Sequence, residues 1–372
     1  MDDINIVIIG AGVVGLAVAA KLSEENEGIY ILERNSKFGR ETSSHNSGVI
    51  HSGIHYPPGS LKARLCVKGN SMIYEICERY KIPCRRLGKL TVAVEEREIA
   101  ELERLIRWGE ANGVEGLKML DREDIKKMEP CIEAVRAVYS PSTGIVEPDE
   151  LMNHFYAKAS KNGAVLVTKT EVTDLRKTKE GYEVCGISYG EKFTVKANSV
   201  INCAGLYSDK IASMVGLDLD KLGYRLHYCK GDYFRVVGSA PNIKTLVYPV
   251  PTKEALGIHI TLDLAGVIRL GPNAYYVNHI SYEVTSPERE FREDVARFLP
   301  QIRNCQLTPD FAGVRPKLQG LGEGFRDFII RHEADRDLFG FINLIGIESP
   351  GLTAAPAIAE LVSEMYKEEV KR

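Results

Sequence analysis

The sequence lacks long apolar runs, an excess of basic charge and paired cysteine motifs. A membrane-spanning helix needs about 20 consecutive apolar residues, so we expect none here. A formal net charge of −3, without a block of basic residues, argues against nucleic acid as a partner. The eight cysteines include no C-x-x-C pair, so neither a zinc site nor a disulfide framework is indicated. The expected site therefore contains no metal.

The sequence also lacks internal repeats, low-complexity segments and the features of a signal peptide. Its apolar start, Ile4–Ile9, has no basic leader and no small-residue cleavage site, so we interpret it as a buried strand. Hydrophobic and charged residues make up 44% and 27% of the chain, as in soluble globular proteins. A length of 372 residues favours two domains. The composition best fits a protein of the reducing cytoplasm.

The first segment of the chain has the pattern of a dinucleotide-binding β-α-β unit. The apolar strand Ile4–Ile9 runs into G-A-G-V-V-G, an Ala/Val/Leu-rich helix follows, and a second strand ends at Glu33. Gly10 permits a tight turn, Gly12 allows the backbone to approach a pyrophosphate, and Gly15 allows close helix–strand packing. The helix N-terminus attracts phosphates, and the Glu33 carboxylate accepts ribose hydroxyls while repelling a 2′-phosphate. The pattern predicts NAD or FAD rather than NADP.

Hydrophobic periodicity in the rest of the chain predicts two domains whose segments interleave. Expected helices lie at 62–74, at 99–112, from 149, at 287–299 and from 351. Expected strands lie at 88–94, 164–168, 170–174, 182–188, 199–205 and 341–346. Alternating β-type segments dominate residues 224–318, which indicates a second, β-rich layer. No simple linker separates the two domains.

Six separated motifs carry a resemblance to a known family. They are Thr42–Tyr56, Tyr248–Pro251, Leu256–Thr261, Leu270–Asn273, Gly313–Lys317 and Ile347–Thr353. In this order, and over residues 4 to about 360, the chain resembles the FAD-dependent L-2-hydroxyglutarate dehydrogenase/oxidase family of D-amino-acid-oxidase-like flavoproteins. The resemblance implies an α/β (α+β) fold similar to D-amino-acid oxidase and glutathione reductase. A Rossmann-like FAD-binding domain (1–82, 146–216 and 322–372) would interleave with a β-rich substrate-binding domain (83–145 and 217–321).

The resemblance also implies which residues hold FAD. Glycines and the acidic residue of the first motif would bind the ADP half, and hydroxyls and backbone donors that follow would line the pyrophosphate and ribityl chain. A helix N-terminus near the C-terminal end of the chain would face the flavin pyrimidine. The expected cofactor residues are Gly10, Gly12, Val14, Gly15, Glu33, Arg34, Thr42, Ser43, Ser44, Asn46, Ser47, Val172, Ala204, Gly205, Gly351, Leu352 and Thr353.

For the reaction, the family implies that a 2-hydroxy acid loses hydride to flavin N5 while its hydroxyl proton passes to a base. His51 is the first choice for this base, because related glycerol-3-phosphate oxidases carry a histidine in a similar N-S-G-x-x-H-x-G motif, and His259 is the second. Arg315 suits a bidentate grip on the substrate carboxylate. Other residues expected to line the site are Tyr56, Lys230, Tyr248, His45 and His55.

One motif departs from the family pattern, which often reads Thr-Pro-Arg where this chain has Thr261-Leu262-Asp263. An arginine there would suit the distal carboxylate of 2-hydroxyglutarate, so a shorter or different 2-hydroxy acid is an alternative substrate. A glycerol-3-phosphate oxidase/dehydrogenase, with a phosphate clamp of Arg and Lys, is the second interpretation. An amino-acid oxidase of the same superfamily is the third.

Two further interpretations have less support. A binding module without turnover leaves His51, His259 and Arg315 unexplained. An NAD-linked dehydrogenase usually has a contiguous nucleotide domain, and this chain has no second G-x-G-x-x-G motif for NAD beside FAD. Electrons would therefore leave by oxygen, a quinone or a protein carrier. We expect a cytoplasmic protein, with peripheral contact at the inner face of a membrane if the acceptor is a quinone.

Overall fold

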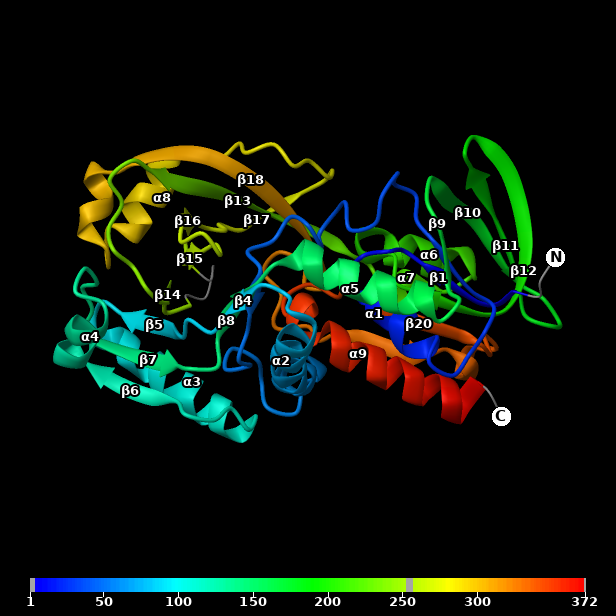
Figure 1. Ribbon diagram of the computed structural model, residues 1–372, viewed down its shortest axis with the longest axis horizontal. Coiled ribbons are helices and arrows are strands. Elements are labelled where there is room, and N and C mark those ends of the chain that lie inside the picture. The colour runs from blue at the N-terminus through cyan, green and yellow to red at the C-terminus, as the bar shows by residue number, and fades with distance from the viewer. Residues whose placement is uncertain (1–3, 252–256, 371–372) are drawn as a thin grey trace. The chain divides into compact units, whose positions relative to one another are not determined.

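The computed structural model describes residues 4–251 and 257–370, so Leu256 of the third motif lies outside the described residues. The chain divides into two compact units, each built from segments far apart in sequence (Figure 1). Unit 1 comprises Met1–Ser44, Pro148–Tyr228 and Arg315–Arg372, and unit 2 comprises His45–Glu147 and Cys229–Val314. Within these described ranges, no helix has the length and apolar character needed to cross a membrane.

Unit 1 is built on a mixed sheet whose centre is parallel. Strand β1 (Ile4–Ile9) lies between β2 (Ile29–Leu32) and β12 (Glu191–Asn202), and runs parallel to both. The strand order is β10-β11-β12-β1-β2-β9, and β20 pairs with β12 and with β19. The remaining strands are β9 (Val165–Val167), β10 (Thr170–Lys177), β11 (Tyr182–Ser188), β19 (Ile329–His332) and β20 (Phe341–Ile345).

Helices cover both faces of this sheet. Helix α1 (Val13–Leu22) contacts α5 (Pro148–Lys161) and α9 (Gly351–Met365), and the three run side by side (Figure 1). Its small residues permit this close approach, since eight of its ten residues are buried. On the opposite face, Ile211 and Ala212 of α6 (Ser208–Met214) pack in one apolar cluster with Val7 and Ile9 of β1. Helix α7 (Leu219–Leu222) follows α6.

Unit 2 is dominated by a second mixed sheet, in the order β17-β13-β16-β15-β14-β5-β7-β6, with β18 beside β13. Its strands are β5 (Lys89–Ala93), β6 (Lys118–Asp121), β7 (Arg136–Ser140), β13 (His227–Val237), β14 (Leu246–Pro249), β15 (Ile260–Leu262), β16 (Ile268–Leu270), β17 (Tyr275–Val277) and β18 (Gln306–Lys317). A small sheet has the order β3-β8-β4, formed by Val49–Ile50, Gly144–Val146 and Cys84–Arg85. The helices are α2 (Leu61–Tyr80), α3 (Ile99–Ala111), α4 (Arg122–Met128) and α8 (Glu288–Val295).

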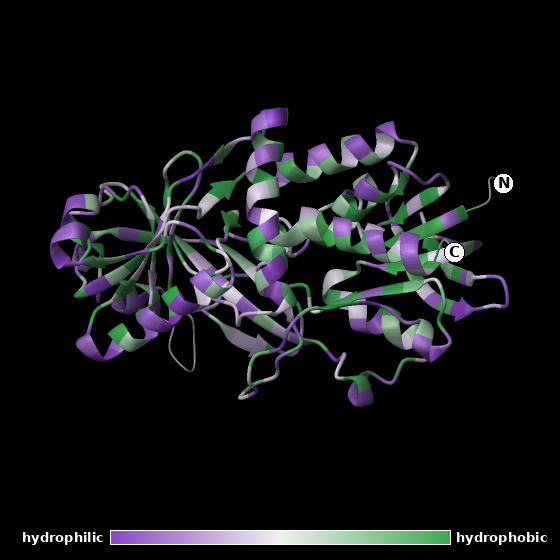
Figure 2. Cartoon of the chain, turned by 90° about the horizontal axis from the view of Figure 1, so that it is seen from below, coloured by the Kyte–Doolittle hydropathy of each residue, from purple (hydrophilic) through white to green (hydrophobic). Residues whose placement is uncertain are grey.

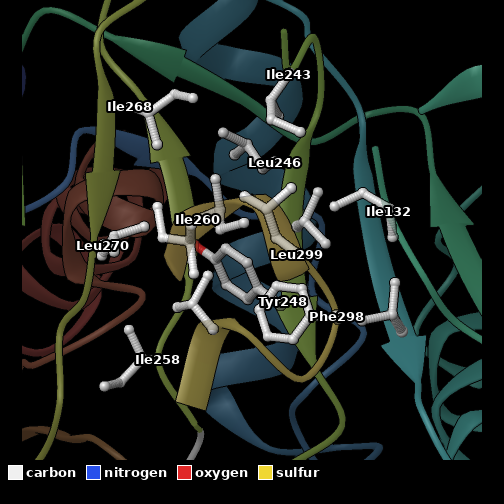
Figure 3. Packing of buried hydrophobic residues seen from close by; sticks show 14 of the residues in the cluster. Ile132, Ile243, Leu246, Tyr248, Ile258, Ile260, Ile268, Leu270, Phe298 and Leu299 are labelled. Carbon is white, nitrogen blue, oxygen red and sulfur yellow. The ribbon is translucent and has the colours of Figure 1, made fainter. Parts of the chain in front are cut away.

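The core of unit 2 is a large apolar cluster. Ile258, Ile260, Leu270, Phe298 and Leu299 lie close together in it (Figure 3). Helices of both units show hydrophilic and hydrophobic residues in alternating bands along their length, as expected for helices with one face buried (Figure 2). Strand β5 is buried throughout its five residues, although the first is a lysine and the third a threonine. This polar pair within a buried strand is central to the site described below.

Most elements expected from the sequence are present, but the boundaries of the units differ from those of the expected domains. Residues 217–228 and 315–321, expected in the substrate-binding domain, belong to unit 1. We expected residues 45–82 to belong with the nucleotide-binding segment, whereas they form part of unit 2. Strand β3 pairs with β8, and Asn70 and Tyr74 of α2 both donate to the carbonyl of Ser142. These long-range bonds join the segment to residues 142–146 of unit 2, and sequence periodicity carries no information about them.

Candidate functional site

Unit 1 contains a cavity at the carboxyl end of strand β1. Its volume is about 360 Å³, within the range of small-molecule sites. Nine of the expected cofactor residues line it, namely Gly10, Gly12, Glu33, Arg34, Thr42, Ser43, Val172, Ala204 and Gly205. Segments from three parts of the sequence therefore meet around one cavity, as the dinucleotide interpretation requires.

The three glycines of the first motif lie where a side chain would not fit. Gly10 has φ +101°, and a Cβ there would lie 2.5 Å from the carbonyl oxygen of Cys203. A Cβ on Gly15 would lie 2.0 Å from the carbonyl oxygen of Gly10, so helix α1 and strand β1 approach as closely as backbones can. A Cβ on Gly12 would lie 2.9 Å from the hydroxyl oxygen of Ser43. The predicted tasks of Gly10 and Gly15 thus have a direct steric basis.

The first turn of helix α1 offers a positive end to the cavity. It contains no acidic residue, and Gly12 supplies no side-chain cap. The backbone N–H of Val13 instead donates to Ser43 Oγ over 2.9 Å. The Glu33 carboxylate accepts the N–H of Ala11 (2.9 Å) and both the N–H (2.8 Å) and the side-chain amide (2.9 Å) of Asn35. The N-terminus of α1 therefore favours a phosphate group. The Glu33 carboxylate, held by these hydrogen bonds, favours the hydroxyls of a ribose.

The cavity is also lined by Arg34, Lys210 and Tyr207, of which only Arg34 was expected from the sequence. The guanidinium of Arg34 lies 3.8 Å from the ring centroid of Tyr207, and Arg34 Nη2 donates to the Tyr207 hydroxyl over 2.8 Å. Lys210 Nζ lies 5.1 Å from the same ring, and Arg34 also pairs with Glu41. Tyr207 lies two residues after Ala204-Gly205, which were expected to bind FAD. This closeness in sequence was the only signal for Tyr207.

The structure places the other expected cofactor residues outside the lining of this cavity. Val14 and Gly15 belong to helix α1, and Ser44 Oγ donates to the carbonyl of Glu41. Gly351, Leu352 and Thr353 form the first turn of α9, as the sequence predicted for a helix N-terminus. Asn46 and Ser47 belong to unit 2, where Asn46 Oδ1 accepts the N–H of Gly48 over 2.8 Å.

Unit 2 presents a polar face on one side of its sheet. Tyr248 of β14 pairs with Thr91 of β5, and paired side chains point to the same face. The ring of His259 stacks on Tyr248 with centroids 3.5 Å apart and planes 7° apart, and Lys89 Nζ lies 4.7 Å from the Tyr248 centroid. Thr261, two residues beyond His259, shares this face. The hydroxyls of Thr91 and Thr261 are buried without a hydrogen-bond partner in the described residues.

Lys89, which the sequence analysis did not single out, is at the centre of this polar face. Its side chain is 0% exposed, and Nζ lies 2.8 Å from Nε2 of His55. Burial lowers the pKa of Lys89 to about 7. Burial, followed by the nearby Lys89, holds the pKa of His55 well below its usual value. A lysine at the start of an otherwise apolar strand was the only sequence signal for this arrangement.

His51 is held at the end of strand β3 by its backbone. Its carbonyl accepts from Asn70 Nδ2 (2.9 Å) and from the thiol of Cys66 (3.4 Å), both on helix α2. Burial, with the nearby Lys89 as the second cause, lowers the pKa of His51 to about 3. An imidazole with this pKa is unprotonated at neutral pH, which is the state that a proton acceptor needs.

The remaining expected site residues of unit 2 have varied surroundings. The segment with Tyr56 is fixed by Asn112 Nδ2, which donates to the carbonyls of Gly53 (3.2 Å) and Tyr56 (2.9 Å). His45 stacks on Tyr282 at 4.2 Å. Lys230 is 3% exposed, donates to the carbonyl of Glu283 and lies 3.7 Å from Asp232.

Lys230 is therefore part of a buried ion pair, and its role as a wall residue stays a prediction. Arg315, at the C-terminal end of β18, is partly exposed and belongs to unit 1.

Comparisons with known proteins agree with this geometry. The family model for FAD-dependent oxidoreductases (DAO) matches residues 5–365. The mitochondrial L-2-hydroxyglutarate dehydrogenase of Arabidopsis thaliana is 36% identical over 98% of this chain and 84% of its own length. The glycerol 3-phosphate dehydrogenase of Caloramator mitchellensis is 34% identical over 99% of this chain and 75% of its own length.

Solved structures show the same fold. The dithionite-reduced L-α-glycerophosphate oxidase of Mycoplasma pneumoniae, with FAD bound, has a TM-score of 0.86 and 28% identity. The match covers 99% of this chain and 95% of the oxidase chain. Glycine oxidase of Geobacillus kaustophilus has a TM-score of 0.82 and 21% identity, and covers 98% of this chain and 95% of its own. The predicted fold class is therefore confirmed.

The residues of the unit 1 cavity fit FAD. The glycine contacts exclude side chains where a pyrophosphate approaches, the helix end is free of acidic residues, and a fixed carboxylate stands where ribose hydroxyls are expected. With the family match over residues 5–365, these features confirm the prediction of FAD as the cofactor. The chain belongs to the DAO family of FAD-dependent oxidoreductases, with the L-2-hydroxyglutarate dehydrogenases among its relatives, and acts on a CH–OH donor.

Proposed function

We propose that this oxidoreductase oxidises the α-carbon of an L-2-hydroxy acid, with L-2-hydroxyglutarate as substrate and 2-oxoglutarate as product. The relative from Arabidopsis thaliana, named for this substrate, supports the proposal over almost the full chain. The single observation that carries it is the group of His51, His55, Lys89 and His259 in unit 2. Unprotonated imidazoles beside a buried cation suit removal of a proton from an anionic hydroxy acid.

In this proposal, histidines of the chain take the proton of the substrate hydroxyl and FAD takes the hydride. His51 accepts the hydroxyl proton, and its low pKa keeps it ready to do so throughout the neutral range. His259, buried and stacked on Tyr248, is the alternative acceptor. FAD, when bound, supplies the acceptor for the hydride from the α-carbon. An external electron acceptor then completes each turnover, and oxygen, a quinone or a protein carrier would all serve.

The direct test is an anaerobic titration of the purified protein while its flavin absorbance is followed. We expect L-2-hydroxyglutarate to bleach the flavin, and the D enantiomer and L-lactate to leave it yellow. Bleaching by L-lactate in preference would show a shorter hydroxy acid as substrate. A flavin that remains yellow with L-2-hydroxyglutarate would contradict the proposal.

Glycerol 3-phosphate is the second candidate substrate, because a relative and a solved structure are named for it. Both molecules carry an oxidisable C–OH group near an anion, but a phosphate needs a clamp of several basic side chains. In unit 2 the buried Lys230 is already paired with Asp232, which removes one candidate for such a clamp. Bleaching by glycerol 3-phosphate alone would favour this second function.

We propose Arg315 as the group that binds the substrate carboxylate, because a guanidinium matches a carboxylate with two parallel hydrogen bonds. Arg315→Ala is expected to lower kcat/KM for L-2-hydroxyglutarate about 10- to 100-fold, mainly through KM, since a charged hydrogen bond contributes about 1.5–3 kcal/mol. Steady-state kinetics would measure this, with the exposed Arg303→Ala as the matched control. Unchanged kinetics in Arg315→Ala would remove this residue from the substrate site.

A further inference from the structure

Lys89 is a buried cation without a carboxylate partner in the part of unit 2 that the structure describes. Its Nζ has two neighbours of note, His55 Nε2 at 2.8 Å and the face of the Tyr248 ring at 4.7 Å. Burying an ammonium in this way is costly, and buried lysines are normally paired. Lys230 of the same unit is also buried, but it lies 3.7 Å from the carboxylate of Asp232. A carboxylate partner of this kind is the usual way in which a buried lysine charge is balanced.

The titratable groups that the structure describes close to Lys89 include no carboxylate. Cys66 of helix α2 has a pKa raised by burial, and Tyr248 of β14 likewise has a raised phenol pKa. His51 and His55 follow strand β3, and both have pKa values lowered first by burial and then by Lys89. The pKa of His55 is also lowered by His259, which precedes β15, and by Arg104 of α3. Among the described residues, no neighbouring anion therefore offsets the charge of Lys89.

We propose that Lys89 is a positioning residue of the histidine group in unit 2, which fixes the ring and the tautomer of His55. The inference rests on the proposed function, because it assigns Lys89 to the same proton-transfer site. Lys89 is fully buried and its Nζ contacts His55, so we assign it a role through this histidine.

The tautomer argument follows from the hydrogen bond between the two side chains. A charged Lys89 can only donate, so His55 Nε2 must accept and its proton must reside on Nδ1. A neutral Lys89 can accept, which allows the Nε2–H tautomer. His55 Nδ1 is buried without a hydrogen-bond partner in the described structure, so a proton on Nδ1 is an unsatisfied buried donor, and the Nε2–H tautomer is favoured once Lys89 is neutral. Because the pKa of Lys89 is about 7, the tautomer of His55 should change near neutral pH while His55 itself remains uncharged.

The first test follows the histidine ring nitrogens by NMR in the purified flavoprotein, with His51→Gln and His55→Gln used for assignment. In the unsubstituted protein, the His55 signals should move from the Nδ1–H to the Nε2–H tautomer with a midpoint near pH 7. Lys89→Met should abolish this transition, and Lys89→Arg should hold the Nδ1–H tautomer at every pH because arginine stays charged. Identical His55 signals in all three proteins would overturn the proposal.

Stability gives a second readout that separates positioning from a structural role. Because folding lowers the pKa of Lys89, the unfolded chain binds more protons between about pH 7 and pH 10, and stability from this group rises with pH across that window. Lys89→Met should therefore raise Tm by about 2 °C or more below pH 7, and the difference should shrink toward pH 10. A residue with only a structural role would lower Tm on substitution. The exposed Lys118→Met of strand β6 is the matched control, with an unchanged Tm.

The third readout is kinetic. Lys89→Met should lower kcat about 10- to 100-fold while KM changes less than about threefold, since Lys89 is assigned a role through His55 and not through substrate binding. Lys89→Arg should restore part of kcat and lack the change in rate near pH 7. Equal kcat in Lys89→Met and the unsubstituted protein would contradict the positioning role. If L-2-hydroxyglutarate fails to reduce the unsubstituted protein, the proposed function fails, whereas the NMR and Tm results still decide the link between Lys89 and His55.

Discussion

His51→Gln is expected to slow bleaching of the flavin by L-2-hydroxyglutarate about 10²- to 10⁴-fold, the usual contribution of a positioned general base. Glutamine occupies a similar space but cannot accept a proton at neutral pH. FAD should remain bound, because the cavity that fits it is lined by residues of unit 1 alone. Rapid mixing under anaerobic conditions would give the rate, and the flavin-to-protein absorbance ratio would report cofactor retention.

Two further substitutions make this result interpretable. His279→Gln changes an exposed histidine of unit 2 and should leave the rate unchanged. His259→Gln removes the alternative base, which stacks on Tyr248. A normal rate in His51→Gln together with a slow rate in His259→Gln would transfer the role of base to His259, and normal rates in both would dismiss the histidine mechanism.

Gly15→Ala is expected to yield a protein that retains little or no FAD and unfolds more easily. The added methyl group would lie 2.0 Å from the Gly10 carbonyl oxygen and 3.3 Å from Cys203 Cβ, so strand β1 and helix α1 must separate. Forced overpacking of this kind, against backbone atoms, costs about 3 kcal/mol or more. The movement would also displace Gly10 and Gly12, which line the cavity. Flavin content after purification and thermal unfolding would measure the two effects.

The control for this substitution is Gly163→Ala in the same unit. Gly163 also has a positive φ, +91°, but a Cβ there would meet nothing within 4 Å. This variant should therefore show a small loss of stability from the backbone conformation and full flavin content. Equal flavin content in Gly15→Ala and Gly163→Ala would mean that the close approach of α1 to β1 is not needed for the cofactor.

The cofactor site could be predicted from the sequence because its signals are local. A strand, three glycines at fixed spacing, a helix and Glu33 all lie within one short segment, and each has a steric or electrostatic task. The same local reasoning located the first turn of α9 at Gly351. Tyr207 was missed because its contact with Arg34 joins two segments that are distant in sequence.

The substrate unit was less predictable because strand register sets it. Lys89 and Tyr248 meet on one face only because β5 and β14 pair with Leu246 opposite Lys89, and neither strand's own pattern contains that register. Periodicity marked β5 as a strand, yet it could not show that Lys89 is buried next to His55. Periodicity also could not show that Lys230 forms a buried ion pair with Asp232. Long-range pairing also explains why residues 45–82, expected with the nucleotide-binding segment, form part of unit 2.

The interleaved order of segments has a consequence for synthesis of the protein. Helix α9 packs against α1, and β20 pairs with β12, so the last segment of the chain completes the layer around the first motif. A ribosome releases the glycine motif long before it releases these partners, and until then the side of α1 that packs against α9 is uncovered. A frameshift or premature stop late in the coding sequence would therefore act at a distance, by leaving the helix of the cofactor motif partly exposed.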